Sequence, residues 1–408
     1  MGFQQGLSGL NAASKNLEVI GNNVANTNTV GFKTSRAEFG DVYASSLLGA
    51  STNSPGLGTT VQDIAQQFTQ GSLSVTNNPL DVAVNGDGFF RLSKNGAISF
   101  SRNGAFHVDR DGYIVNANSE RLTGSPVSPN GAILNSSVPQ DLRVGTADVA
   151  PNTTTEAQVV ANFDSRSTTL PVAGFSSSDP ATYHNSTTVQ FYDSLGNSHS
   201  LTTYFMKDAP NRWQVFAEND GAPVGVGPVG TITFTSTGAI DTAATTLPFN
   251  LSLNIAGGAT TPQAVALDFT NSTQFGAAYG VTQVSQDGYT SGRVLGFSIG
   301  DDGMVLGRYS NGQTRPQGQI VLASFRNPQG LTPIGNNDWL ESSESGQPLV
   351  GAPSTGSLGV LQSGALEESN VDLTAELVNM IVAQRVYQAN AQTIRTQDQL
   401  LQTLVTLR

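Results

Sequence analysis

The sequence predicts a mainly β protein that begins and ends with an α-helix. The last 38 residues, 371–408, contain no Gly and no Pro, although the 408-residue chain has 44 Gly and 18 Pro. Apolar residues recur every seven positions at both ends, which is the spacing of a helical seam. Between the ends, short alternating stretches are separated by Gly-rich turns, a pattern typical of β-strands.

The C-terminal helix is expected from about Asp372 to Val405, roughly 50 Å at ~1.5 Å per residue, with Ser369 and Asp372 as a capping signal. One row comprises Leu373, Met380, Tyr387, Ile394 and Leu401, and a second row, offset by four, comprises Leu377, Gln384, Ala391, Asp398 and Val405. Residues 377–386, which include Ile381, are apolar on nearly every face, so this helix is expected to be buried all round. The polar seam positions Gln384 and Asp398 either set the register or face a water-filled channel.

The N-terminal helix is expected over residues 1–24. Phe3, Leu10, Leu17 and Val24 are spaced by seven, and Leu7 follows Phe3 by four. A helix of this length is marginal alone in water. We therefore expect the two terminal helices to pair with each other or with other subunits, rather than to pack on a domain of their own.

The organisation is predicted to be nested. Residues 1–30 and 366–408 form a terminal helical, tube-forming domain, 31–70 a connecting segment, 71–145 and 285–365 an inner β-domain, and 146–284 an inserted outer β-domain. In the inner domain, Asn-Gly and Asp-Gly pairs such as Asn95-Gly96 favour hairpin turns and predict a β-meander. Residues 342–365 are interpreted as a Gly/Ser/Pro linker.

Composition excludes several classes of function. A net charge of -12 and a pI near 4.6 argue against a nucleic-acid partner, which requires a basic face. The chain has no Cys, so disulfides, thiol nucleophiles and Cys-based metal sites are absent. The sequence contains no run of about 18 apolar residues, so no membrane insertion is predicted. The N-terminus lacks the features of a cleaved signal peptide.

No catalytic, cofactor-binding or metal-binding residues are predicted. The Asp residues stand mostly beside Gly in expected turns, and a turn explains Asp109 and Asp111 better than a calcium loop does. The three His residues, His107, His184 and His199, are interpreted as isolated. The sequence therefore favours assembly over an enzymatic function.

Several motifs resemble those of bacterial flagellar rod and hook proteins. The segments 8–13, 20–26 and 29–33 resemble the N-terminal signature of that family, and 364–367, 369–373 and 376–381 resemble its C-terminal signature. Segments 80–84, 88–90 and 101–106 resemble its inner β-domain. The resemblance covers about residues 1–125 and 285–408, and its signature residues are Asn22, Asn23, Asn26, Gly31, Phe32, Lys33, Ser369, Asn370 and Asp372.

The resemblance implies a structural, non-enzymatic subunit of the bacterial flagellum, located outside the cell and exported unfolded by the type III apparatus. The length of the insertion 146–284 favours the hook members of the family over the shorter rod members. Such a subunit polymerises into a curved tube, the universal joint that transmits torque from rod to filament and encloses the export channel. The implied partners are further copies of itself, rod proteins, the hook cap, hook-filament junction proteins and the export apparatus.

The terminal helices would form the inner tube. The predicted assembly interface comprises Phe3, Leu7, Leu10, Leu17, Val24, Leu373, Leu377, Met380, Ile381, Tyr387, Ile394, Leu401 and Val405. Two alternatives remain at this stage. One is a distal rod protein of the same family, and the other is a secreted β-rich binding module, such as an adhesin, with its ligand site in 146–284.

Overall fold

The computed structural model describes residues 2–42, 56, 58–128, 131–134, 138–145 and 147–406. The side chains of residues 2 and 404–406 lie outside this description. The chain forms two compact units. The first comprises Met1–Thr146, Gly296–Arg308 and Thr314–Arg408, and the second comprises Ala147–Leu295 and Tyr309–Gln313.

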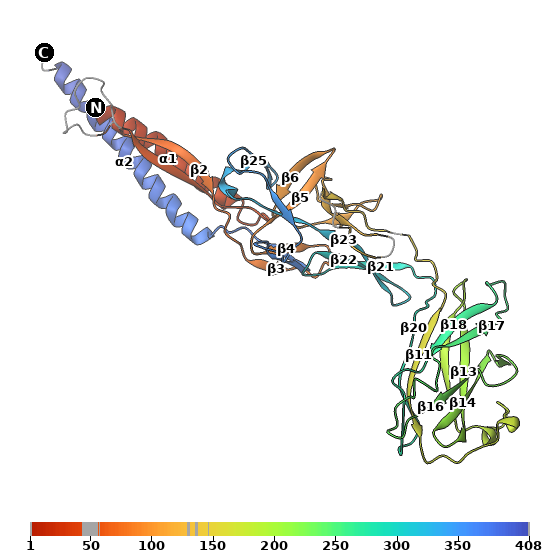
Figure 1. Cartoon of the computed structure of the whole chain (residues 1–408). Coiled ribbons are helices and arrows are strands. Elements are labelled where there is room, and N and C mark those ends of the chain that lie inside the picture. The colour runs from red at the N-terminus through yellow and green to blue at the C-terminus, as the bar shows by residue number, and fades with distance from the viewer. Residues whose placement is uncertain are drawn as a thin grey trace. The chain divides into compact units, whose positions relative to one another are not determined.

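The two terminal helices are α1 (Gly2–Ala25) and α2 (Leu373–Thr406), which lie side by side in the first unit (Figure 1). The ends of both helices lie within two residues of the ends predicted from the sequence. The cap of α2 differs from the expected one. Asp372 Oδ1 accepts hydrogen bonds from the Thr374 and Ala375 amides at 2.9 and 3.1 Å, whereas Ser369 Oγ accepts one from the Val371 amide, before the helix begins.

A two-stranded antiparallel hairpin follows α1. It consists of β1 (Ser35–Val42) and β2 (Gly58–Gln66), with a register shift between Glu38 and Phe39. Both strands contact α1, and Figure 1 shows the hairpin running along the helix pair. The predicted connecting segment 31–70 therefore contains a β-hairpin that becomes part of the helical region.

The remaining strands of the first unit surround two buried cores. One core contains Val82, Phe90, Leu92, Ile114 and Leu322, and the other is built around Phe89, Phe100 and Trp339. Many of these strands belong to a 13-stranded sheet, while β4 pairs with β28 and β3 with β29. The strands are β3 (Leu73–Val75), β4 (Val82–Asn85), β5 (Phe89–Lys94), β6 (Ala97–Ser101), β7 (His107–Val108), β8 (Ile114–Val115), β9 (Arg121–Pro126), β10 (Gln140–Asp141), β21 (Val294–Ile299), β22 (Met304–Tyr309), β23 (Thr314–Ile320), β24 (Leu322–Ser324), β25 (Thr332–Gly335), β26 (Asp338–Leu340), β27 (Leu349–Gly351), β28 (Val360–Ser363) and β29 (Ala365–Glu367).

The expected meander is only partly present. Asn95 and Gly96 have φ values of 53° and 88°, and they join the paired strands β5 and β6 in the predicted hairpin. In contrast, Asn103-Gly104 is not a hairpin turn, because the Gly104 carbonyl accepts a hydrogen bond from the Val82 amide of β4. Strand β6 instead pairs with β26, and β4 with β28.

The interpretation of residues 342–365 as a linker is wrong. This segment contains β27 and β28, and β29 begins at Ala365. These strands are short and rich in small residues, so alternation did not reveal them. Strand β27 pairs with β24. Strands β28 and β29 pair with β4 and β3, near residues 73–85, and so close the inner β region through contacts between distant parts of the chain.

The second unit contains two five-stranded sheets that enclose one core, with Phe163, Phe205 and Trp213 fully buried. The predicted strands near 187–192, 200–206, 212–217 and 231–235 are all present, and Asp193–Gly196 forms the expected turn. The strands are β11 (Glu156–Asp164), β12 (Asn185–Tyr192), β13 (Ser198–Ala209), β14 (Arg212–Asn219), β15 (Ala222–Pro223), β16 (Gly230–Thr233), β17 (Phe249–Leu253), β18 (Gln263–Asp268), β19 (Thr273–Phe275) and β20 (Gly280–Gln286).

Candidate assembly site

The contact between α1 and α2 within one chain is made by small side chains. Ala12 and Ala13 of α1 and Ala383 of α2 are buried. A Cβ added at Gly6 would meet Ile394 Cγ1 at 3.0 Å, and one added at Gly9 would meet Asn390 Oδ1 at 2.8 Å. The pairs Gly6–Ile394 and Gly9–Asn390 also show that the helices are antiparallel. Side chains of α2 therefore pack directly on α1 at its Gly positions, and a search for large apolar residues in the sequence does not reveal this contact.

Most of the large apolar residues of the predicted interface point away from this contact. Phe3, Leu7, Leu377, Ile381 and Leu401 are 47%, 45%, 45%, 52% and 55% exposed. Leu373 and Tyr387 are also exposed, Leu10, Leu17, Val24, Met380 and Ile394 are half-buried, and the side chain of Val405 lies outside the described residues. The single chain thus leaves much of the predicted apolar surface of its helices uncovered.

The two polar seam positions also lie outside the contact between the helices. Gln384 and Asp398 are exposed, and Asp398 accepts a hydrogen bond from Gln402 at 3.0 Å. The α2 residues that face α1 include Ala383, Asn390 and Ile394 instead. The assignment of Gln384 and Asp398 to a seam is therefore wrong for the pair of helices within one chain.

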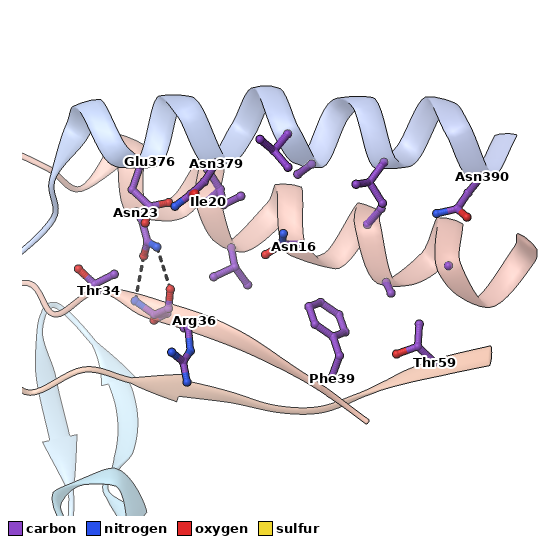
Figure 2. Close-up of a pocket in the computed structure, with 18 of the residues that line it drawn as sticks. Asn16, Ile20, Asn23, Thr34, Arg36, Phe39, Thr59, Glu376, Asn379 and Asn390 are labelled. Atoms are coloured by element: carbon purple, nitrogen blue, oxygen red, sulfur yellow. Dashed lines mark hydrogen bonds between the residues drawn. The ribbon is translucent and has the colours of Figure 1, made fainter. Parts of the chain in front are cut away.

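A groove of about 640 Å³ lies between α1, α2 and the β1–β2 hairpin. Its apolar lining includes Ala12, Val19 and Ile20 of α1 and Val382 and Val386 of α2. Figure 2 shows polar side chains between these elements, among them Asn16, Asn379 and Asn390. Glu376 also lines the groove, and its Oε2 atom is buried without a hydrogen-bond partner among the described residues.

A buried ionic cluster joins segments that are distant in the sequence. Glu367 Oε1 accepts hydrogen bonds from Lys33 Nζ at 2.6 Å and from the Gly71 amide at 2.9 Å, and Oε2 accepts one from Arg102 Nη1 at 3.2 Å. The Lys33 and Glu367 side chains are 0% exposed, and that of Arg102 is 3% exposed. Burial lowers the pKa of Lys33, and the Glu367 carboxylate opposes that shift.

Other signature residues connect the same segments. The Asn23 side chain bonds both to the Ser35 amide and to the Ser35 carbonyl, at 2.9 and 2.8 Å (Figure 2). Asn370 Oδ1 accepts from the Thr34 amide at 2.7 Å, and its Nδ2 donates to the Gln67 carbonyl at 2.8 Å. These bonds anchor the residues that follow α1 and those that precede α2, so the two helices leave the β region together.

Gly31 fits this junction because it has no side chain. Its φ is +72°, in the left-handed region, and an added Cβ would lie 2.7 Å from the Asn103 amide nitrogen. Its own amide donates to the Glu367 carbonyl at 2.8 Å. The structure thus brings together Asn23, Gly31, Lys33 and Asn370, which belong to two signatures more than 300 residues apart.

The remaining signature residues act locally. The Asn26 amide and its side chain both bond to the Asn22 carbonyl, at 3.1 and 2.9 Å, where α1 ends. Phe32 is half-buried. Ser369 and Asp372 organise the start of α2 as described above. This second group therefore sets the limits of the helices.

One predicted isolated histidine has close charged partners. His199 lies between Asp220 and Asp193, with its Nδ1 2.6 Å from Asp220 Oδ2 and its Nε2 3.3 Å from Asp193 Oδ2. These carboxylates outweigh partial burial and raise the pKa of His199. The interpretation of His199 as isolated is therefore wrong, because strand pairing brings the turns around Asp193 and Asp220 together. No cluster of three or more His, Cys, Asp or Glu suited to a metal occurs in the described part of the chain.

The segment around Asp109 is a turn, as predicted. Asp109 Oδ1 accepts hydrogen bonds from the amides of Asp111 and Tyr113 at 2.9 and 2.8 Å. Within the described residues, neither terminal helix has the combination of length and hydropathy needed to cross a membrane.

Comparison with protein families defines the class. The N-terminal residues 3–33 match the model of the flagella basal body rod protein, and 362–407 match the flagellar basal body rod FlgEFG protein C-terminal model. Between them, 83–157 match the flagellar hook protein FlgE/F/G D1 domain and 162–289 the flagellar basal body protein FlaE D2 domain. The helix pair, the junction and both β regions are therefore those of a flagellar axial protein.

Full-length relatives narrow this class. The flagellar hook protein FlgE of Escherichia coli is 42% identical and that of Salmonella typhimurium 41% identical, each over 100% of both chains. The FlgE protein of Borreliella burgdorferi is 35% identical over 99% of this chain and 98% of its own. The chain belongs to the flagellar hook protein family, whose members are structural and not enzymatic. It is a hook subunit of the flagellum and assembles with further copies of itself.

A solved structure shows the shared fold. The crystal structure of Helicobacter pylori flagellar hook protein FlgE2 aligns with 72% of this chain and 100% of its own, with a TM-score of 0.53 at 15% sequence identity. The full-length matches also bear on the two alternatives. These matches include the inserted β region, which favours a hook subunit over a shorter rod protein. They also argue against the secreted β-rich binding module, because they extend over the whole chain.

Proposed function

We propose that the terminal helices of this hook subunit form the inner tube of the hook, around the export channel. In this proposal the predicted interface residues from Phe3 to Val24 and from Leu373 to Val405 contact neighbouring copies. The β regions form the outer layers, in the order terminal domain, connecting segment, inner β-domain and outer β-domain given by the sequence.

The observation that carries this proposal is that different residues of the terminal helices make the contact within the chain and form the exposed surface. Small residues of α1 pair with α2, whereas seven of the large apolar residues stay exposed and five are half-buried. Full burial of a Leu-sized side chain contributes roughly 1.5–3 kcal/mol, so covering about ten half-exposed side chains contributes on the order of 10 kcal/mol. This is comparable to the estimated 4–15 kcal/mol cost of association. Several neighbours per subunit then make polymerisation favourable.

The outer β regions supply flexibility in this proposal. Only 12% of the residues are charged, so neighbouring subunits meet mainly through neutral polar surfaces with few ion pairs that fix one register. Adjacent subunits can then slide while the inner tube stays closed. Such a curved tube acts as a universal joint and transmits torque from rod to filament.

The proposed partners besides further copies are the rod, the hook cap, the hook-filament junction proteins and the type III export apparatus. We also propose that the chain is exported unfolded and without a cleaved signal peptide. The absence of Cys supports this route, because folding outside the cell then needs no oxidation step.

Electron microscopy of the purified protein tests the proposal. The wild-type protein should form curved tubes with a central channel, and Ile381→Asp should abolish them, because it buries an unpaired charge between subunits. Leu349→Asp is the control, since Leu349 is 67% exposed on β27, away from the helices. Wild-type protein that stays monomeric when seeded, or Ile381→Asp tubes of normal length, would refute the proposed tube.

A further inference from the structure

We propose that the groove between α1, α2 and the β1–β2 hairpin receives α2 of a second copy. The inserted surface is the exposed row Leu373, Leu377 and Ile381, called the outer row below. This inference rests on the proposed tube of terminal helices and identifies which two surfaces meet in it.

The outer row and the groove lie on opposite flanks of the same helix. Successive residues of an α-helix are about 100° apart, so Leu373 and Leu377 flank the row facing α1 on one side. Val382 and Val386, which line the groove, flank it on the other side. The outer row therefore cannot reach the groove of its own chain.

The outer row has the geometry of a packing ridge. Its members are spaced by four residues and are 43%, 45% and 52% exposed. Side chains at this spacing form the ridges that enter grooves on a neighbouring helix. The groove offers a matching apolar lining in Ala12, Val19, Ile20, Val382 and Val386.

The polar part of the groove also matches. Glu376 Oε2 is buried there, and none of the described residues donates a hydrogen bond to it. A buried acceptor left unpaired is unfavourable, and more so when it is charged. Gln384 follows Leu377 by seven residues, so it lies on the same flank as the outer row and is exposed. Its side-chain amide can donate to Glu376 of the copy whose groove is filled. The polar residue that interrupts the predicted seam thereby sets the register.

A contact of this kind joins two different surfaces and is heterologous. Each added copy leaves one groove and one outer row free, so the contact propagates instead of closing a dimer. This is the property that a tubular polymer requires, and it distinguishes the proposal from a symmetric contact of outer row with outer row.

Because the chain has no Cys, single cysteines can map this contact. We would prepare L377C on the outer row and V386C in the groove, each with a tag of different mass. Both side chains are about half exposed, at 45% and 47%, so the variants should fold. They would be copolymerised, checked for tubes by electron microscopy and treated with a mild oxidant.

The expected product is the mixed L377C–V386C dimer, with little cross-linking in tubes of either variant alone. We also expect the V386C thiol to react freely with maleimide in the monomer and at least tenfold more slowly in the tube. L377C coupling to itself as efficiently as to V386C would overturn the proposal in favour of a symmetric contact.

Two further outcomes would also overturn the proposal. One is tubes that form normally while the mixture gives no mixed dimer. The other is a V386C thiol already protected in the monomer, which would show that the groove is covered by its own chain. Failure of wild-type protein to form tubes at all would instead refute the proposed function, so the two failures are distinguishable.

Discussion

Replacing Glu367 by Gln removes the carboxylate that Lys33 and Arg102 share at the junction below the helices. The change preserves the size of the side chain, so its main effect is to leave two buried cations without their counter-charge. Breaking a buried ion pair by removing one partner costs about 3–5 kcal/mol. We expect Glu367→Gln to destabilise the first unit by at least about 3 kcal/mol, because both Lys33 and Glu367 are fully buried.

The loss should depend on pH in a defined direction. Burial lowers the pKa of Lys33, and without Glu367 the pKa falls further. The folded variant then binds fewer protons than the unfolded chain at pH values between the lowered pKa of Lys33 and the ordinary lysine pKa, about 10.4. Its stability therefore rises with pH in that range, and the difference from wild type should shrink between pH 7 and pH 10.

Hydrogen exchange in increasing denaturant, followed by mass spectrometry on monomeric protein, measures this effect for each unit. Peptides covering β4 to β6 report on the first unit, and peptides covering β12 to β14 serve as an internal control. Glu38→Gln is the matched control variant, because the Arg36–Glu38 pair is 69% and 44% exposed and such pairs contribute little. A Glu367→Gln loss below about 1 kcal/mol, or one equal in both units, would refute the reasoning.

Three further predictions follow from other sites. Gly31→Ala should lower the melting temperature measured by circular dichroism, because the φ of Gly31 is +72° and the added Cβ would lie 2.7 Å from the backbone nitrogen of Asn103. Gly21→Ala, whose Cβ would meet no described atom beyond its own helix within 4 Å, should be neutral or stabilising, because Ala favours helix by about 1 kcal/mol, and equal effects would contradict the close contact. Burial and the neighbouring Glu120 carboxylate raise the pKa of Asp338 to about 7, so the folded state binds more protons and wild-type stability should fall as pH rises from about 4 to 7. Asp338→Asn should remove that fall in the free energy of unfolding, which amounts to up to about 4 kcal/mol at ~1.4 kcal/mol per pKa unit. Denaturation measured at pH 5 and pH 8 checks this, and an unchanged pH profile would contradict it. Residues 150–291 can be replaced by an Asn-Gly turn, because Val149 and Gly292 are paired. Electron microscopy should then show hooks that form but are straight or stiff. Normal curvature with normal motility would contradict the sliding of outer domains.

The elements predicted best from the sequence are those set by local rules. The ends of α1 and α2 were predicted within two residues, because Gly and Pro exclusion and apolar spacing are properties of neighbouring residues. The hairpin at Asn95-Gly96 was predicted for the same reason, since both residues tolerate positive φ. The short strands β27 to β29 were missed, because their pairing partners lie far away in the chain.

The candidate site was predicted unevenly. The large apolar residues were found from their spacing, but spacing does not reveal whether a row meets its own chain or another copy. The small residues Gly6, Gly9 and Ala13 were not recognised as a contact surface. A signal for them existed in the Gly and Ala residues that recur along one flank of α1, and small residues at such positions permit close helix approach.

The sequence by itself determined that this protein has helices at both ends, β regions between them and the motifs of a flagellar axial protein. These features depend on local spacing, turn chemistry and residue type. Only the tertiary structure decided which faces of the helices remain free and which charges meet at the junction. Lys33 and Glu367 are 334 residues apart, and no local pattern specifies such a pair, because its energy appears only when folding removes both groups from water.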